Sequence, residues 1–229
     1  MPSWSYSSIT LFEQCPKKYY HLRIAKDVKE PESDAIIYGK DLHLAAEEFM
    51  RDGKPIPDKY KYIQPMLDKL KALPGEKHCE FKMGVKLIDG GAKIVACDFF
   101  DKNVWYRGIA DLLIVDREKE EARLVDYKTG KSAQYADTKQ LKLMAGAVFT
   151  HFPEIKEIKA GLLFVVANDF IREEYQSMFR TAYFQQFKPL VQQLEIALES
   201  NVWNPKRNFT CKGWCPVTEC THNEKRRYG

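Results

Sequence analysis

The segment spanning residues 107–131, RGIADLLIVDREKEEARLVDYKTGK, constrains the fold more than any other part of the chain. Two apolar runs, Gly108–Val115 and Ala122–Tyr127, flank the charged stretch Asp116–Glu121. Such a pattern predicts a β-hairpin. Both strands are apolar on both faces, which is typical of strands buried within a sheet. The hairpin is therefore expected to lie inside the protein core.

The register of this hairpin decides where its charged side chains lie. If Arg117–Glu120 form a four-residue loop, Asp111 lies directly opposite Asp126, with Cβ atoms about 4.5–5.5 Å apart. Lys128 follows two residues later on the same face. A generic aspartate–lysine pair can instead be a surface ion pair worth about 0–1 kcal/mol. The apolar flanks and the turn at Thr129–Gly130 favour a buried site, where a divalent cation would relieve the repulsion between the carboxylates.

Composition indicates one globular domain spanning residues 1–229. The chain is 45% hydrophobic and carries a net charge of +4, which permits a nucleic-acid partner without requiring one. The N-terminus lacks a basic segment followed by an apolar run, and no stretch reaches the roughly 18 apolar residues of a membrane span. We therefore expect an intracellular protein with no membrane partner.

Periodicity predicts an α/β fold, with a central mixed sheet flanked by helices. The expected helices are Ser5–Leu22 (interrupted at Pro16), Tyr38–Arg51, Tyr60–Ala72, Ala133–Phe149 and Thr181–Ser200. The further expected strands are His78–Leu87, Ile94–Tyr106 and Ile158–Ala167, with a strand or turn at Phe170–Phe179.

Three polar residues outside the hairpin are candidates for the same site. Strict alternation places Glu80 on one face with His78 and Lys82, from which it could supply a third carboxylate. His43 lies at the edge of a buried helical stripe, and a neutral imidazole is a good transition-metal ligand. Gln140 follows the lysine strand and could reach a phosphate or hold the lysine. The alternatives are a solvated glutamate, a structural histidine and an exposed glutamine.

The C-terminal segment is short of apolar residues and carries closely spaced cysteines. These are Cys211, Cys215 and Cys220. Cys15 is the first candidate for a fourth ligand and His222 the second. Sets of four thiolates bind zinc or an iron–sulfur cluster. Such a site would join segments 1–23 and 201–229; the alternative is a tail of unliganded thiols.

Taken together, these motifs resemble the PD-(D/E)XK nuclease superfamily, in particular its RecB-like branch. That branch includes the nuclease domains of RecB and AddB, CRISPR-associated RecB-type nucleases and small phage exonucleases. The matching motifs are Ser5-x-Ser7 followed by C-P-K-K-Y-Y at Cys15, Gly39-x-x-x-His43, G-I-A-D ending at Asp111, D-Y-K-T-G beginning at Asp126, and Gln140. The chain departs from the branch at Met144, where a tyrosine is usual, and in the spacing of its C-terminal cysteines.

The resemblance implies a restriction-endonuclease-like fold and metal-dependent hydrolysis of phosphodiester bonds. Asp111, Asp126 and the backbone carbonyl of Tyr127, with Glu80 and His43, would hold Mg²⁺ or Mn²⁺. Lys128 would orient the attacking water or neutralise developing charge, and Gln140 would position the lysine or the substrate. It also implies that the four cysteines (Cys15, Cys211, Cys215, Cys220) hold a [4Fe–4S] cluster, with zinc as the alternative.

The implied partner is DNA, single-stranded or with single-stranded ends, and the implied role is an exonuclease in recombination, repair or phage DNA processing. Such a role implies a protein partner in a recombination or replication complex, in the cytoplasm of a bacterial, archaeal or phage-infected cell. Basic and aromatic residues could follow the strand or form a solvated face: Lys17, Lys18, Tyr19, Tyr20, Arg23 and Lys225–Arg227. The competing functions are a non-catalytic nucleic-acid-binding scaffold with an iron–sulfur or zinc site, and a zinc-binding interaction protein.

Overall fold

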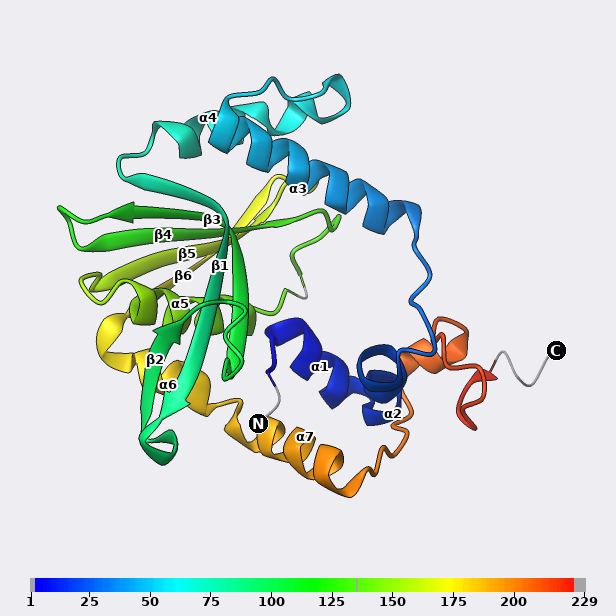
Figure 1. Ribbon diagram of the computed structural model, residues 1–229. Coiled ribbons are helices and arrows are strands. Elements are labelled where there is room, and N and C mark those ends of the chain that lie inside the picture. Colours follow the sequence, from blue (N-terminus) through cyan, green and yellow to red (C-terminus); the bar gives the residue numbers. More distant parts are fainter. Residues whose placement is uncertain (1–2, 135, 225–229) are drawn as a thin grey trace. The chain divides into compact units, whose positions relative to one another are not determined.

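The computed structural model describes residues 3–134 and 136–224, and a six-stranded mixed sheet forms its centre (Figure 1). The strands lie in the order β2-β1-β3-β4-β5-β6. Only the β4–β5 pair is parallel, and the other four pairs are antiparallel. The strands are β1 (Glu76–Ile88), β2 (Lys93–Cys97), β3 (Tyr106–Asp116), β4 (Glu121–Lys128), β5 (Glu157–Phe164) and β6 (Asp169–Gln176). The predicted α/β fold with a mixed central sheet is thereby confirmed.

Seven α-helices accompany the sheet in the described part of the chain. They are α1 (Tyr6–Gln14), α2 (Pro16–Tyr19), α3 (Asp34–Asp52), α4 (Gln64–Ala72), α5 (Lys139–His151), α6 (Arg180–Gln185) and α7 (Lys188–Ser200). A π-helical turn, Tyr20–Ala25, continues directly from α2. Within the described residues, no helix has both the length and the apolar character needed to cross a bilayer.

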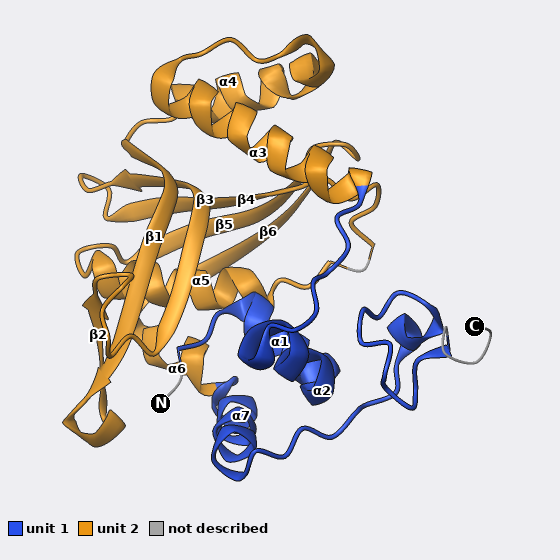
Figure 2. Ribbon diagram, turned by 45° about the vertical axis from the view of Figure 1, so that its right-hand side comes forward, with its two compact units in different colours: residues 1–33, 186–229 blue, residues 34–185 orange. Residues whose placement is uncertain are grey.

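The chain divides into two compact units (Figure 2). The sheet unit comprises residues 34–185 and holds the six strands with α3 to α6. The cysteine unit comprises residues 1–33 and 186–229, so both ends of the chain contribute to it. Within the cysteine unit, α1, α2 and α7 precede or follow the long insertion that forms the sheet unit.

Helices cover both faces of the sheet within the sheet unit (Figures 1 and 2). The layer of α3 and α4 packs on one face through an apolar cluster that includes Leu42, Phe49 and Leu67 from the helices and Leu112 and Val125 from the strands. Helix α5 lies on the other face, with Leu141, Met144 and Phe149 among its buried residues.

The burial of β3 changes at Asp111. From Tyr106 to Asp111 buried residues alternate with open ones, whereas Leu112–Asp116 are all buried. Alternation means that one face of the strand is covered, and continuous burial means that both are. The layer of α3 and α4 therefore covers only part of its face, and Asp111 lies at the boundary.

The β3–β4 hairpin has the predicted register. Asp116 pairs with Glu121 across the hairpin, which confirms the four-residue loop, and the ladder extends to Leu112 opposite Val125. Continued by one residue, this register sets Asp111 against Asp126.

The helix expected at 60–72 begins only at Gln64, after a 3₁₀ turn at Asp58–Ile63, and the strand expected at 158–167 ends at Phe164. Three further predicted boundaries are wrong, each for a local reason. The helix expected at 181–200 is two helices, α6 and α7, and Pro189 lies in the first turn of α7. A proline inside one continuous helix would lack an N–H for hydrogen bonding, and its ring would clash with the preceding turn. The helix expected from Ala133 begins only at Lys139, where the Asp137 side chain accepts a hydrogen bond from the Lys139 backbone. The strand expected at 94–106 ends at Cys97, and aspartate side chains fold residues 98–105 into a loop.

Candidate active site

Glu80 has an unusual backbone conformation for the middle of a strand. Its φ of +49° lies in the left-handed region, which is costly for a residue with a Cβ atom. Strict alternation would place His78 and Phe81 on opposite faces, yet their rings pack 5.1 Å apart. The expected alternation through residues 78–87 is therefore wrong at this point, because the left-handed residue reverses the faces beyond it. Unfavourable backbone of this kind is concentrated at functional sites.

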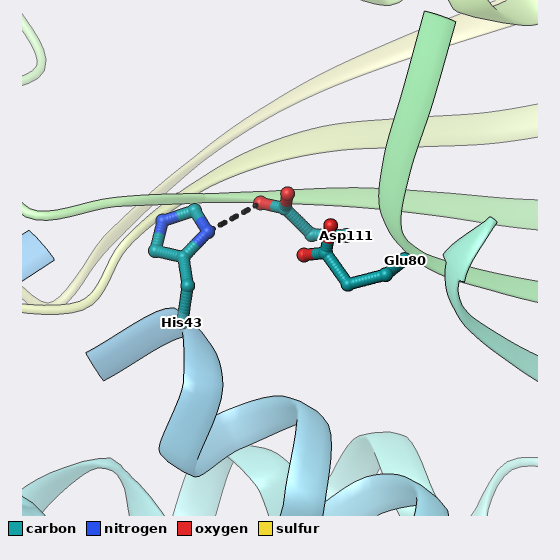
Figure 3. A group of neighbouring side chains, drawn as sticks. All are labelled: His43, Glu80 and Asp111. Carbon is teal, nitrogen blue, oxygen red and sulfur yellow. Dashed lines mark ion pairs between the residues drawn. The ribbon is translucent and has the colours of Figure 1, made fainter. Parts of the chain in front are cut away.

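Glu80, Asp111 and His43 converge at this irregularity, from β1, β3 and α3 respectively (Figure 3). One ligand atom from each lies within 4.8 Å of the other two. His43 Nδ1 is 3.4 Å from Asp111 Oδ2. Two carboxylates and an imidazole form a donor set suited to a divalent cation, and the imidazole favours Mn²⁺ more than a purely oxygen shell does.

The electrostatics of this group also favour a bound cation. Burial raises the pKa of Glu80, and the negative charges of Asp111 and Glu47 raise it further. Burial lowers the pKa of His43, but the hydrogen bond to Asp111 and the surrounding carboxylates outweigh burial, so the pKa is raised overall. An excess of negative charge contributes to both shifts. A metal ion bound between the carboxylates would neutralise that charge.

A second group of polar side chains lies beside the first and contains Asp126, Lys128 and Gln140. Lys128 Nζ is 2.6 Å from Asp126 Oδ2 and donates a hydrogen bond of 3.1 Å to Gln140 Oε1. Gln140 Nε2 in turn donates to Asp126 Oδ1 at 2.8 Å. Each residue of this triad thus contacts the other two. Burial and the Asp111 charge raise the pKa of Asp126 to about 6, although Lys128 acts in the opposite direction.

Tyr127 links the two groups. Its backbone N–H donates a 2.7 Å hydrogen bond to Asp111 Oδ2, so the side chain of Asp111 takes a place that a backbone carbonyl would fill in a regular ladder. Its ring packs perpendicular to His43 at 5.8 Å, and burial raises the pKa of its phenol. Metal ligation by the Tyr127 carbonyl stays a prediction.

An open pocket of about 670 Å³ lies over the first group. His43, Glu80 and Asp111 line it together with Glu47 and Thr129. Sequence reasoning missed Glu47, although its position four residues after His43 on a helix placed it on the same side. The rim also contains half-exposed apolar side chains: Ile36, Leu44 and Ile109.

Gly39 permits the close approach of α3 to the turn that follows Lys128. A Cβ atom at this position would lie 3.3 Å from Thr129 Oγ1. In the Gly39-x-x-x-His43 pattern, the glycine therefore leaves room for the Thr129 side chain, and the histidine supplies a candidate metal ligand.

The structure brings the four predicted cysteine ligands together in the cysteine unit. Cys15, Cys211, Cys215 and Cys220 line one small enclosed cavity, which His222 also borders. The Cys15 sulfur accepts backbone N–H hydrogen bonds from Lys18 at 3.5 Å and Lys206 at 3.4 Å. Burial raises the pKa of Cys215, and the neighbouring Cys15 and Cys211 raise it as well.

Four thiols around one cavity fit either group that sets of four thiolates bind, a zinc ion or an iron–sulfur cluster.

The predicted basic and aromatic track near the N-terminus is wrong in part. Tyr19 is buried and packs on Trp203 at 6.0 Å. Lys18 is also buried and forms a 2.8 Å ion pair with Glu30. Neither side chain is available to a strand of DNA. Residues 225–227 lie outside the described part of the chain.

Comparison with known proteins agrees with this geometry. The family model of the PD-(D/E)XK nuclease superfamily matches residues 3–220, and the chain belongs to this family. Membership implies a metal-dependent hydrolytic nuclease with a nucleic-acid substrate. A search of curated proteins found no match.

Among solved structures, the crystal structure of SSO0001 aligns with a TM-score of 0.49 and 12% sequence identity, covering 97% of this chain and 88% of that one. A similarity this weak adds nothing to the family match.

Proposed function

We propose that this protein is a Mg²⁺- or Mn²⁺-dependent deoxyribonuclease of the RecB-like branch, acting as an exonuclease on single-stranded DNA. The observation that carries the proposal is the pairing of two groups: a carboxylate–imidazole set beside a lysine held by an aspartate and a glutamine. A module that only binds DNA needs no such arrangement. The half-buried, negatively charged set fits a divalent cation.

His43, Glu80 and Asp111 would hold that cation, with Asp126 adjacent. When bound, a divalent cation polarises the phosphoryl oxygen and lowers the pKa of a coordinated water. The protein contributes the position of the ligands: Asp111 is fixed by the Tyr127 N–H, and His43 is fixed by Asp111.

Lys128 supplies the positive charge of the site. Its ammonium group is held between Asp126 and Gln140, so it needs little reorganisation before it contacts a phosphate or a water. A charge placed in advance where negative charge develops is an effective form of electrostatic catalysis. Gln140 donates to Asp126 and accepts from Lys128, so it acts as a positioning residue.

We further infer that Cys15, Cys211, Cys215 and Cys220 hold a [4Fe–4S] cluster. Two observations support this proposal: the shared cavity and the N–H hydrogen bonds to the Cys15 sulfur. A brown solution absorbing near 400 nm, with iron and sulfide in the purified protein, is expected. A colourless protein that contains stoichiometric zinc would contradict the cluster and support the zinc alternative.

The same family resemblance supports a role in recombination, repair or phage DNA processing, in the cytoplasm and beside a protein partner. Single-stranded DNA is the expected substrate, or duplex DNA with single-stranded ends.

The test of the nuclease is turnover. The purified chain is incubated with end-labelled single- and double-stranded DNA and Mn²⁺, beside Asp126→Ala and Lys128→Ala. Asp58→Ala, at an exposed acidic residue whose ion-pair partner is the neighbouring Lys61, is the matched control. Wild type and control are expected to shorten single strands from an end, and the two site variants to leave them intact. Intact DNA with wild type, or equal degradation by the site variants, would support a non-catalytic scaffold instead.

A further inference from the structure

An open strip of the sheet leads away from the acidic pocket. The β1–β3 ladder pairs Lys82 with Ile109 and Gly84 with Arg107, both beyond Glu80 and Asp111. In β3, Arg107, Ile109 and Asp111 are the residues on the open side, because their neighbours are buried. Lys82 is exposed between buried or partly covered neighbours in β1. The strip therefore shares its face with the carboxylates of the pocket.

Two phenylalanines in the loop at residues 98–105 border this strip, and each is paired with a cation. Lys82 Nζ lies 5.7 Å from the centre of the Phe100 ring and 6.0 Å from that of Phe99. Arg107 Cζ lies 5.5 Å from the Phe99 ring. Phe100 is 73% exposed, an unusual position for a large apolar side chain. Among the described residues, Lys82 makes its contacts with these rings and with no carboxylate.

The loop that carries these rings is held in place. Arg107 Nε donates a 2.8 Å hydrogen bond to the Phe99 carbonyl, and the Phe100 N–H donates to Asp98 Oδ1 at 2.7 Å. Val104 and Trp105 are buried and anchor the end of the loop. The exposure of Phe100 is therefore a property of an ordered loop, and the ring is held in advance for a partner.

We propose that Lys82, Arg107 and the Phe99–Phe100 pair form a track that holds a single strand of DNA beside the acidic pocket. Steps of two residues along a strand cover about 7 Å, so Lys82 lies one such step from Glu80 and Arg107 two from Asp111. The cations match phosphates, and the exposed ring can stack on a base. The proposal rests on the proposed nuclease function and adds a substrate-binding surface to it.

The occupant follows from the chemistry of the strip. In a duplex, base faces are covered by neighbouring pairs, so an exposed phenyl ring has little to stack on. In a single strand every base offers a free face, and stacking on an aromatic side chain is tolerant of sequence. The Phe100 ring therefore selects for unpaired DNA, whereas the two cations serve any nucleic acid.

The experiment measures binding without turnover. Fluorescence anisotropy follows a labelled oligothymidine and a blunt duplex of equal length, in EDTA, with the full-length chain. The variants are Phe100→Ala and Lys82→Ala. The matched controls are Met178→Ala, another highly exposed apolar residue of the sheet unit, and Lys93→Ala, an exposed lysine at the first residue of β2. Thermal melts check that each variant is folded.

The expected result for Phe100→Ala is a roughly 5- to 100-fold weaker affinity for the single strand, with a much smaller change for the duplex. Lys82→Ala is expected to weaken binding and to reduce the slope of log K against log salt by about 0.7, the value for one phosphate contact on a single strand. Both controls are expected to bind as wild type does.

Three outcomes separate this proposal from the nuclease proposal. If wild type binds and degrades single strands but Phe100→Ala and Lys82→Ala bind equally well, the track is wrong and the nuclease stands. If the variants lose affinity but wild type fails to cut with Mn²⁺, the track stands and the nuclease is wrong. If wild type does not bind the oligothymidine at all, the track is refuted.

Discussion

The two units of this protein each gather candidate metal ligands, but of opposite chemical character. The sheet unit offers carboxylates and an imidazole, and its residues carry 24 basic and 24 acidic side chains. The cysteine unit offers thiols, and its residues carry 12 basic and 8 acidic side chains. The net charge of +4 therefore belongs entirely to the cysteine unit. Non-specific attraction for a polyanion arises in the unit that does not hold the hydrolytic residues.

The units also differ in what holds their ligands in place. In the sheet unit, the strand ladders that flank Asp111, Asp126 and Glu80 and a large apolar cluster position these side chains. In the described tail after α7, few side chains are buried, and two of those are the candidate ligands Cys211 and Cys220. The comparison supports the proposal that a metal is a catalytic component in one unit and a structural one in the other.

The largest effect is expected from breaking the cysteine set. Cys15→Ala and Cys215→Ala should each lose the colour and solubility of the protein together and lower Tm by about 10 °C or more, because a structural metal contributes directly to folding. Cys97→Ala, outside the set, is the control. Absorbance near 400 nm and thermal melts measure the two properties. A variant that loses its colour but keeps its Tm would show that the metal of the cysteine unit is not structural.

The next effect concerns the residue that positions Lys128. Gln140→Leu removes both hydrogen bonds at nearly constant volume and should lower kcat by about 10- to 100-fold with little change in KM, as for other residues that orient a metal site. Gln193→Leu, an exposed glutamine of α7, provides the control. Steady-state kinetics with Mn²⁺ separate the two constants. A rise in KM alone would indicate that Gln140 contacts substrate instead.

A smaller effect should expose the strain at Glu80. In metal-free protein, Glu80→Gly should be more stable than Glu80→Ala by about 1 kcal/mol, because only glycine adopts positive φ without cost. The same pair of substitutions at Lys82, which has ordinary strand backbone, should show the opposite order. Urea denaturation in EDTA measures the differences. If the glycine variant is less stable than the alanine variant at both positions, glycine relieves no backbone strain at Glu80.

The smallest effect is a pH dependence in the sheet unit. Burial lowers the pKa of His151, although its hydrogen bond to the Gly84 carbonyl acts in the opposite direction. The unfolded chain therefore binds the proton more readily, so the contribution of His151 to stability is complete above about pH 6.5 and is lost as the pH falls below it. His151→Gln should flatten the Tm profile between pH 7 and pH 5. An unchanged profile would exclude His151 as its source.

Much of the site could be predicted from sequence, because its parts depend on local pattern. A charged stretch between two apolar runs determined the register that sets Asp111 against Asp126, and cysteine spacing pointed to the C-terminal thiols that line one cavity with Cys15. The left-handed backbone of Glu80 could not be predicted, since glutamate has no local preference for it and only the surrounding sheet imposes it.

Other features depend on residues far away in the sequence, and one depends on a proline whose effect varies with its position in a helix. The burial of Tyr19 depends on Trp203, which is far away in sequence. Pro189 could have predicted the break between α6 and α7. A proline destabilises the interior of a helix strongly but is tolerated in the first turn. The open strip beside the pocket required knowledge of where the layer of α3 and α4 ends.

The discontinuity of the cysteine unit has a consequence for biosynthesis. Cys15 emerges early from the ribosome, but its partners Cys211 and Cys220 emerge only after the whole sheet unit. At ordinary rates of about 5–20 residues per second, this thiol waits roughly 10–40 s for them. The nuclease residues are thus assembled while the first ligand thiol is still unpaired. Insertion of the proposed cluster would therefore be the last step of maturation, and the Cys15 thiol would lack its partners until then.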